Sequence, residues 1–325
     1  MQQTPTKFDV SVVGELNLDI ILSGLPETLQ LDREHLARDL NVTLGSSSAI
    51  FAHNLALLGN KVAFSSSIGD DAFGGICLER LGGSGVDLSS VRRFRGQQTG
   101  LTIILSQGAQ RYILTYPGTM SEMRYEDIDL DYVCRAKHFH LSSYFLQRAL
   151  RPKMSELFRH VKEHGLTTSL DTNDDPDAQW SEDLLQVLKY VDVLLPNESE
   201  ACKISHKQDI QAAAAFLSGL VPLVVIKRGR QGVLAQRGSE IFVAEARVTE
   251  FVDAVGAGDS FDAGFIHQYV RRAPIHDCLN FGNITGALSV TRAGGTEAFR
   301  DKSLRELFLK SHWPGRVASS TAEVS

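Results

Sequence analysis

The chain has 325 residues, 43% of them hydrophobic, and its 39 acidic and 33 basic side chains give a net charge of −6. This length corresponds to about two domains, or to one large α/β domain with an insertion. Because non-specific nucleic-acid binding relies on clustered Lys and Arg, the acidic balance argues against it. No apolar run reaches the roughly 20 residues that span a bilayer, and the N-terminus lacks the pattern of a signal peptide. We therefore expect a cytoplasmic protein with no nucleic-acid and no membrane partner.

The four cysteines, Cys77, Cys134, Cys202 and Cys278, are widely spaced and form no C-x-x-C pair. This spacing argues against both a zinc knuckle and a disulfide framework. Because a free cysteine packs like a small hydrophobic residue, we expect four buried free thiols.

The N-terminal quarter of the chain mixes two kinds of strand. Residues 8–14 form a short β-branched run that ends in glycine, which is typical of a buried strand that leads into a loop. Runs 16–22 and 39–44 also favour strands, and they come before any helix that could cover a parallel sheet. A helix predicted over 47–58 and a strand over 61–68 then begin a strand–helix alternation.

A predicted β-hairpin interrupts this alternation. After a helix over 71–81, residues 98–106 and 111–116 alternate β-forming residues around the turn Q-G-A-Q. Together with the two early strands, the hairpin gives about four strands outside the strand–helix order. We therefore predict a small separate sheet that acts as a lid and comprises residues 16–44 and 97–117.

From residue 136 onwards, strands and helices alternate without interruption. The strand candidates are 138–142, 167–171, 192–195, 223–227 and 232–236. This alternation predicts a doubly wound α/β domain, with a mostly parallel sheet, helices on both faces and ligands beyond the carboxyl ends of the strands. The domain is expected to comprise residues 8–15, 45–96 and 118–313, and the small polar stretch 314–325 is expected to be a frayed tail.

The most informative segment is D-A-V-G-A-G-D-S-F-D-A-G-F, residues 253–265. Gly256, Ala257 and Gly258 leave almost no side chain over three peptides, and helical spacing begins at Asp259. The N–H groups of such a helix N-terminus, with the positive end of the helix dipole behind them, bind anions such as phosphate. Asp259 would then stand where a general base belongs. The local sequence equally allows a plain glycine-rich turn in which Asp259 only caps the helix.

Two further motifs follow predicted strands. Asn197 and Glu200, in P-N-E-S-E, form an N-x-x-E pair suited to a hydrated Mg²⁺ ion, which needs only a carboxylate and one or two further oxygens. The same pair also fits the N-cap and N3 positions of a helix, and the two roles are compatible. Lys227, Gly229 and Gly232, in K-R-G-R-Q-G, form a basic glycine-rich turn that suits nucleotide phosphates or ribose.

Together these motifs resemble the ribokinase-like (PfkB) family of carbohydrate kinases. Residues 253–265 are similar to the second signature of that family, and P-N-E-S-E, V-V-I-K-R-G-R-Q-G and G-N-I-T-G-A-L-S-V-T-R-A-G-G follow its order, from about residue 8 to 298. The resemblance implies a ribokinase-like fold with a β-sheet lid, and an ATP-dependent phosphotransferase with an alcohol acceptor. It further implies Mg²⁺ as cofactor, K⁺ near the loop of Asp253, and a homodimer formed through the lid.

The resemblance also implies roles for individual residues. The catalytic residues correspond to the general base Asp259 and an anion hole formed by Gly256, Ala257 and Gly258. The nucleotide- and magnesium-binding residues correspond to Asn197, Glu200, Lys227, Gly229, Gly232 and Asn283. Of these, Glu200 is the implied metal contact, through water, and Asn283 belongs to the adenine pocket. The sugar-binding residues correspond to Asn17, Asp19, Gly45, Ser46 and Ser47.

The acceptor end departs from the ribokinase pattern. Ile50 stands where the family has a sugar-binding Asn, and Ser142 where ribokinases have a substrate-binding carboxylate; Asn54, one turn along the helix, is expected to have a surface or capping role. We therefore predict transfer of the γ-phosphate of ATP to a primary hydroxyl of a small sugar. One alternative is an adenosine-like nucleoside kinase, in which Ile50, Phe51 and Tyr144 form an apolar wall for a base. The other is a sensor that binds a sugar without turnover.

Overall fold

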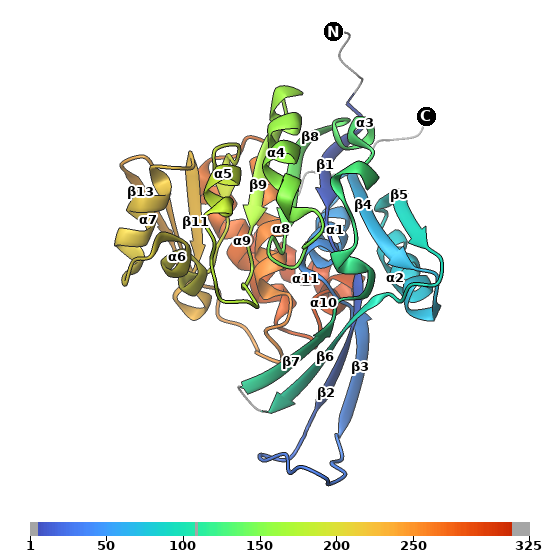
Figure 1. The fold of residues 1–325 in the computed structure, drawn as a ribbon. Helices are drawn as coiled ribbons and strands as arrows, with labels where there is room; N and C mark the ends of the chain where they lie inside the picture. Colours follow the sequence, from blue (N-terminus) through green and yellow to red (C-terminus); the bar gives the residue numbers. More distant parts are fainter. Residues whose placement is uncertain (1–5, 108–109, 314–325) are drawn as a thin grey trace, which may run out of the picture.

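The computed structural model describes residues 6–107 and 110–313, which form a large and a small sheet (Figure 1). In the described residues the large sheet has the strand order β13-β12-β11-β10-β9-β8-β1-β4-β5. Its strands are β1 (Phe8–Val13), β4 (Val62–Gly69), β5 (Asp87–Phe94), β8 (Ala136–Ser142), β9 (Thr167–Asp171), β10 (Val193–Leu194), β11 (Leu223–Lys227), β12 (Val233–Arg237) and β13 (Glu240–Ala244). Pairing is parallel from β5 through β11, and the β11–β12 and β12–β13 pairs are antiparallel.

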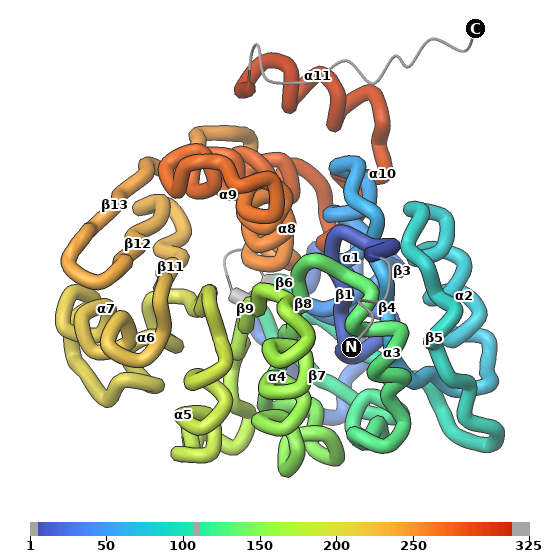
Figure 2. The backbone as a smooth tube through the Cα atoms, turned by 90° about the horizontal axis from the view of Figure 1, so that it is seen from above, coloured from blue at the N-terminus to red at the C-terminus, as the bar shows by residue number. Residues whose placement is uncertain are grey.

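Helices cover both faces of the large sheet, and the view from above separates α8 and α9 from α4 and α5 (Figure 2). The helices are α1 (Ser47–Leu57), α2 (Ala72–Gly82), α3 (Leu130–Val133), α4 (Met154–Glu163), α5 (Asp183–Leu188), α6 (Glu198–Ser205), α7 (Ile210–Ser218), α8 (Ala257–Tyr269), α9 (Ile275–Ser289), α10 (Glu297–Arg300) and α11 (Lys302–His312). One hydrophobic core packs α1, α2, α8 and α9 against the sheet, and a second packs α3 to α7 against its other face. The predicted doubly wound α/β fold is therefore confirmed.

The small sheet projects from the large one (Figure 1). It has the order β3-β2-β6-β7, with β2–β6 parallel and the other two pairs antiparallel. Its strands are β2 (Asn17–Ser23), β3 (Asp39–Leu44), β6 (Gly100–Gln107) and β7 (Gln110–Tyr116). The predicted separate sheet is confirmed, whereas the tip of the predicted turn, 108–109, and the predicted tail, 314–325, lie outside the described residues.

The structure differs from the predictions in two respects. It adds β5 and β13 at the edges of the large sheet, where half-exposed strands carry too weak a hydrophobic pattern to be recognised. All four thiols are free, but only Cys77 and Cys278 are buried, and Cys134 and Cys202 are half-exposed, so the prediction of burial was wrong for these two. None of the described helices combines the length and the apolar character needed to cross a membrane.

Candidate active site

The predicted magnesium and phosphate motifs lie side by side at the carboxyl ends of the parallel strands. Asn197 follows β10, and Lys227 ends β11. The two residues form a parallel β-bridge, and the Lys227 N–H donates to the carbonyl oxygen of Pro196 at 2.9 Å. Parallel strand pairing therefore brings together two motifs that are 30 residues apart in the sequence.

The glycine-rich segment forms the N-terminus of α8, as predicted. Gly256 is the N-cap with φ +72, and a Cβ atom there would lie 2.4 Å from Cα of Gly295, so only glycine fits. In the described part of the chain the N–H groups of Gly256 and Gly258 have no backbone acceptor, whereas that of Ala257 donates to the carbonyl oxygen of Ala254 at 3.2 Å. A tight turn before the helix therefore engages the N–H group of Ala257, and the anion hole itself stays a prediction.

Asp259 lies in the first turn of α8 and its side chain is buried. Burial, followed by the nearby Asp171 carboxylate, raises the pKa of Asp259 to about 7, and Lys227 and the Ser47 hydroxyl act in the opposite direction. A group that titrates near neutral pH can both accept and release a proton there, as a general base must. The environment of Asp259 thus suits a role in proton transfer.

Lys227 is the cation of a buried charge cluster. Its Nζ atom lies 2.7 Å from Oδ2 of Asp171 and 3.1 Å from Oδ2 of Asp262, and both carboxylates are buried. Although burial opposes it, these two carboxylates raise the pKa of Lys227. A Cβ atom on Gly258 would lie 3.5 Å from this ammonium group, so the positive charge stands close to the N-terminus of α8. The sequence analysis missed both carboxylates. Their only signals are that Asp171 ends a strand and that Asp262 lies about one helical turn beyond Asp259.

A cavity of about 550 Å³ adjoins the N-terminus of α8. Six of the predicted residues line it, namely Lys227, Gly229, Gly232, Ala257, Gly258 and Asn283. The sequence analysis did not single out Arg230 and Phe251 in the same wall; the guanidinium carbon of Arg230 lies 5.6 Å from the ring centroid of Phe251. The volume falls within the range of about 300–1,000 Å³ for small-molecule sites, so a nucleotide fits its size and its mixed polar and aromatic lining.

Asn283 and Gly232 shape the wall of this cavity. Nδ2 of Asn283 donates to the carbonyl oxygens of Ala244, at 3.2 Å, and Glu245, at 2.9 Å. Gly232 has φ +80, and a Cβ atom there would lie 2.1 Å from the carbonyl oxygen of Ala244. Both residues therefore fix the chain that leaves β13, which forms one side of the cavity.

Asn197 and Glu200 form a capping box at the start of α6. Asn197 N–H donates to Oε2 of Glu200 at 2.8 Å, the Asn197 amide group donates to Oε1, and Oδ1 of Asn197 accepts from the Glu200 N–H at 2.9 Å. Burial, and then Asp171, raises the pKa of Glu200 to about 7. Since both oxygens of Glu200 already accept hydrogen bonds, Mg²⁺ fits here through a bridging water better than by direct contact.

The predicted acceptor residues lie where the small sheet meets α1. Asn17 Nδ2 donates to Oγ1 of Thr102 at 2.9 Å, and in the described chain its buried Oδ1 has no hydrogen-bond partner. A Cβ atom on Gly45 would lie 2.0 Å from Oδ1 of Asp19, so the glycine leaves room for this carboxyl group. Burial, and then the charge of Asp259, raises the pKa of Asp19 to about 7, which places the two carboxyl groups in one electrostatic environment.

Ser46 and Ser47 have different roles. The Ser46 hydroxyl is the N-cap of α1, accepting from the Ala49 N–H at 3.3 Å and donating to the carbonyl oxygen of Glu15 at 2.5 Å. Helix capping thus engages this hydroxyl, and its contact with substrate stays a prediction. Ser47 accepts from Nδ2 of Asn173 at 3.0 Å and lowers the pKa of Asp259, so its hydroxyl faces the site.

Two more unpaired oxygens belong to this end of the strands. Gln147 Nε2 donates to the carbonyl oxygen of Ser142, the last residue of β8, at 2.7 Å, and Thr172 directly follows β9. Gln147 Oε1 and Thr172 Oγ1 are buried and have no partner among the described residues. A buried polar atom without a partner costs about 1–3 kcal/mol, so these atoms are candidates for contact with a ligand. The sequence carries no motif for either residue.

Asn54 and Ile50 brace the N-terminus of α8. Asn54 is fully buried and its Nδ2 donates to Oγ of Ser260 at 2.9 Å and to the carbonyl oxygen of Gly295 at 3.0 Å. The expected surface or capping role of Asn54 was wrong, because this amide links α1 to α8. Ile50 is buried against the backbone of Gly256 and Gly295, where added Cβ atoms would lie 3.2 and 2.6 Å from its side chain.

The aromatic wall that would favour a nucleoside is not formed. Phe51 is fully buried and stacks on His140 with 3.8 Å between ring centroids. Tyr144 is also fully buried, and its hydroxyl donates to Oδ2 of Asp183 at 3.0 Å. Neither ring presents a surface to a substrate, so the interpretation of both residues as a wall for a base was wrong.

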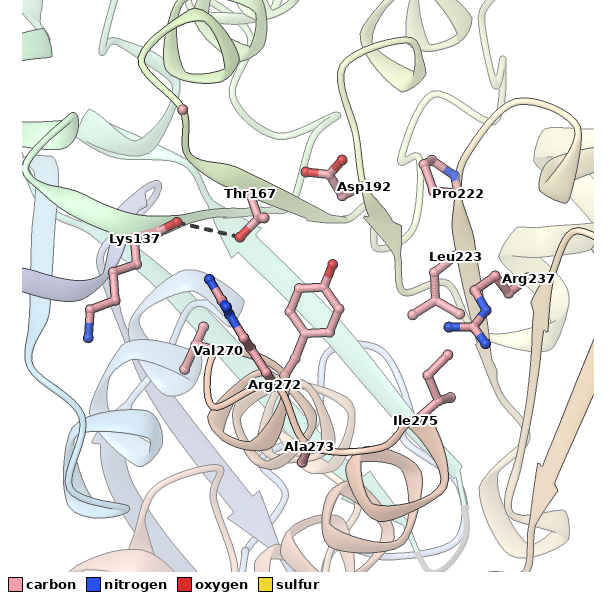
Figure 3. Close-up of a pocket in the computed structure, with 12 residues that line it drawn as sticks. Lys137, Thr167, Asp192, Pro222, Leu223, Arg237, Val270, Arg272, Ala273 and Ile275 are labelled. Atoms are coloured by element: carbon pink, nitrogen blue, oxygen red, sulfur yellow. Dashed lines mark hydrogen bonds between the residues drawn. The ribbon is translucent and has the colours of Figure 1, made fainter.

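A second cavity of about 580 Å³ lies at the opposite, amino-terminal ends of the strands (Figure 3). Lys137, Thr167, Asp192 and Leu223 line it from the starts of β8, β9, β10 and β11. None of the predicted site residues faces it. The 550 Å³ cavity is therefore the one that belongs to the candidate active site.

The model of the pfkB family of carbohydrate kinases matches residues 7–302. The chain belongs to this family. It is 25% identical to the ribokinase of Haemophilus influenzae, with 93% of this chain and 98% of the relative covered, and 28% identical to the cytidine kinase of Thermococcus kodakarensis, with 85% and 93% covered. A provisionally assigned ribokinase II from E. coli, solved with ATP and Mg²⁺, superposes with a TM-score of 0.82 at 26% identity over 94% of this chain and 99% of that one. This PfkB-family protein is therefore a kinase of the sugar and nucleoside class, with an alcohol group as acceptor.

Proposed function

We propose that the protein transfers the γ-phosphate of ATP to a hydroxyl group of a small sugar, with Asp259 as the general base. One observation carries the proposal: the buried Asp259, with its pKa near 7, follows the cavity-lining Gly258 and also acts electrostatically on Asp19. A carboxylate in this position can serve a nucleotide on one side and an acceptor on the other.

In this proposal the 550 Å³ cavity holds ATP. Phe251 offers an apolar surface for the base, and the open N–H groups of Gly256 and Gly258 suit the terminal phosphate. The positive charge of Lys227, which lies between two carboxylates, would attract the phosphates at the same end of the cavity. The relative from E. coli with ATP and Mg²⁺ supports this choice of nucleotide and metal.

The N-x-x-E pair would hold Mg²⁺ through water, because Glu200 and Asn197 already bond to each other. When bound, the ion neutralises charge on the phosphates. The chain itself orients Glu200 through the capping box and keeps it buried beside Asp171.

The acceptor would lie against Asn17 and Asp19. The unpaired Oδ1 of Asn17 accepts a hydrogen bond from one acceptor hydroxyl, and Asp259 takes the proton from the reacting one. The new bond joins the acceptor oxygen to the γ-phosphorus, the bond from that phosphorus to the β,γ-bridging oxygen breaks, and ADP leaves. Preorganised donors such as the open N–H groups of α8 contribute roughly 3–4 kcal/mol each in other enzymes.

We further propose that the segments 16–44 and 97–117 act as a lid. Ile21 of β2 and Ile104 of β6 pack with Val255, which directly precedes the N-cap of α8. Closing of the small sheet would therefore act on the phosphate-binding loop itself and exclude water from it.

The other face of the small sheet suits a homodimer. Val42, Ile20, Ile103 and Leu114 form one row across its four strands, and Val42 and Leu114 are exposed. Such an apolar face is typical of an interface. In sedimentation analysis we expect the wild type to be a dimer and Leu114→Arg a monomer; a monomeric wild type would overturn the dimer and leave the catalytic proposal intact.

A monovalent cation is proposed beside the loop of Asp253. Its carboxylate accepts from the N–H groups of Val255, at 3.1 Å, and Gly294, at 3.0 Å, and so ties two loops together next to α8. A cation that bound here would order the same loops. We expect faster turnover in KCl than in choline chloride of equal ionic strength; equal rates would contradict this part of the proposal.

An acceptor screen tests the function. The protein is mixed with Mg²⁺, ATP and a panel of pentoses, hexoses, sugar acids, adenosine and cytidine, and ADP release is followed, with Asp259→Asn as the matched control. We expect turnover with a sugar that is lost in the variant. Turnover with nucleosides alone would favour the nucleoside alternative, which the similarity to a cytidine kinase also supports. Sugar binding in calorimetry without ADP release would instead identify the non-catalytic sensor.

A further inference from the structure

Three metal-binding side chains meet far from the candidate active site. Cys134 is the C-cap of α3, His160 lies in the last turn of α4, and His164, four residues further on, is the C-cap of α4. One ligand atom from each side chain lies within 4.8 Å of the other two. Helix α3 and the C-terminal end of α4 lie at one end of the large sheet, and the lid lies at the opposite end (Figure 1). The cluster is thus independent of the residues assigned to nucleotide and acceptor.

From this geometry we propose that Cys134, His160 and His164 form a second metal site, selective for a borderline transition-metal ion of the Zn²⁺ class. Thiolate and imidazole are ligands that Zn²⁺ prefers, whereas Mg²⁺ prefers oxygen. Two histidines four residues apart project from the same face of a helix, an arrangement that zinc proteins use. Three protein ligands leave one tetrahedral position for water.

The orientation of the histidine side chains supports the site. Nδ1 of His164 lies 2.8 Å from the carbonyl oxygen of His160, so this hydrogen bond places the proton on Nδ1 and leaves Nε2 free for a metal. The two imidazole rings lie 4.3 Å apart between centroids and are tilted by 32°.

The charge around the cluster also favours a cation. The carboxylate of Asp131, on α3, acts on both Cys134 and His160, and Glu163, on α4, acts on His160 as well; Arg159 is the opposing charge. In a tetrahedral site, ligand atoms at about 2.0–2.3 Å from the ion lie roughly 3.3–3.6 Å apart, so these atoms, now within 4.8 Å of one another, would approach by up to about 1.5 Å on binding. Binding replaces the S–H bond of Cys134 with a metal–sulfur bond, and the proton leaves to the solvent.

A spectroscopic titration tests the site without ATP or turnover, so its result is independent of the proposed kinase reaction. Tag-free protein, treated with a chelator and then freed from it, is titrated with Co²⁺. We expect one Co²⁺ per chain with a thiolate-to-cobalt charge-transfer band, and displacement of this band by Zn²⁺. Cys134→Ser should lose the band, and His164→Gln should weaken binding by more than about tenfold, since even outer-shell changes cost about 10–100-fold.

Cys202→Ser is the matched control, because Cys202 is also half-exposed but lies outside the cluster. It should keep the wild-type band and affinity. The proposal is overturned if the wild type gives no charge-transfer band, or if the band persists in Cys134→Ser. Loss of the band in Cys202→Ser would equally overturn it, because the metal would then lie elsewhere. In a parallel measurement, Zn²⁺ should raise the melting temperature of the wild type and leave that of Cys134→Ser unchanged.

Discussion

Three acidic side chains of the candidate active site have pKa shifts opposite to those of two acidic side chains at the amino ends of the parallel strands. At the amino ends, Asp9 pairs with Lys137 at 2.8 Å and Asp87 with Lys7 at 3.0 Å. Although partial burial opposes it, hydrogen bonds from Ser89, Lys7 and Tyr132 hold the pKa of Asp87 down at about 2. At the carboxyl ends, burial instead raises the pKa values of Asp19, Glu200 and Asp259 to about 7.

The two sets of carboxyl groups therefore have different effects on the stability of the fold. A carboxyl group whose pKa lies below its usual value stabilises the folded chain at neutral pH, whereas one whose pKa is raised destabilises it there. Structural ion pairs account for the lowered pKa values. Carboxyl groups whose pKa is raised to near neutral pH by burial are typical of functional sites. At neutral pH, the carboxyl groups of the candidate active site therefore lower the stability of the fold.

Asp259→Asn should have the largest effect, with a loss of activity and a gain in stability. Loss of the general base should lower kcat by roughly 10²–10⁴-fold in an ADP-release assay, while calorimetry should still detect ATP binding. The folded-state pKa of about 7 lies above the ordinary 3.8, so the stability that this group contributes is lost as the pH rises through that window. Above about pH 8 the variant should therefore resist urea better than the wild type, by as much as about 4 kcal/mol in the free energy of unfolding.

Asp87→Asn is the matched control at the other end of the sheet. Its folded-state pKa of about 2 lies below 3.8, so its stability contribution is present above about pH 4 and is lost as the pH falls towards 2. We expect this variant to be less stable than the wild type at pH 7 and to keep its kcat. A stable, inactive Asp87→Asn, or an Asp259→Asn with near-normal kcat, would contradict the separation of the two ends.

Lys227→Met should lower both stability and activity, because it removes the cation of the buried charge cluster next to the proposed phosphate site. The change leaves the buried carboxylates of Asp171 and Asp262 without their cation, and breaking a buried ion pair in this way costs about 3–5 kcal/mol. Urea unfolding should show this loss, and activity should fall as well. The double variant Lys227→Met/Asp262→Asn should recover part of the stability; a double variant as unstable as the sum of both single changes would argue against the cluster.

The sequence predicted much of this architecture because its signals are local. The positive φ of Gly256 and the capping box of Asn197 and Glu200 follow from residue types within one turn of chain. The separate small sheet followed from strands that come before any covering helix, and such a break in alternation can be read without a structure. Local chemistry and element order therefore sufficed for the fold and for the segment that precedes Asp259.

Contacts between distant segments could not be predicted in the same way. Asn54 reaches Gly295 across 241 residues, and Lys227 reaches Asp171 across 56, with no pattern in the sequence that pairs them. The metal cluster was missed for the same reason, because Cys134 lies far in sequence from His160 and His164 and forms no motif with them. Residues that act through tertiary contacts need the fold before their partners can be recognised.

Ser47→Ala should give the smallest and most specific effect. The Ser47 hydroxyl lowers the pKa of Asp259, so its removal should raise that pKa further. Because the deprotonated carboxylate is the active base, kcat/KM should rise with pH towards a plateau above about 7, and the variant should shift this acidic limb to higher pH by up to about one unit. Ser46→Ala provides the comparison, since that hydroxyl caps α1: stability should fall by about 1 kcal/mol without a shift of the limb. A shift of equal size in both variants would mean that the limb reports the position of α1 and not the proton affinity of Asp259.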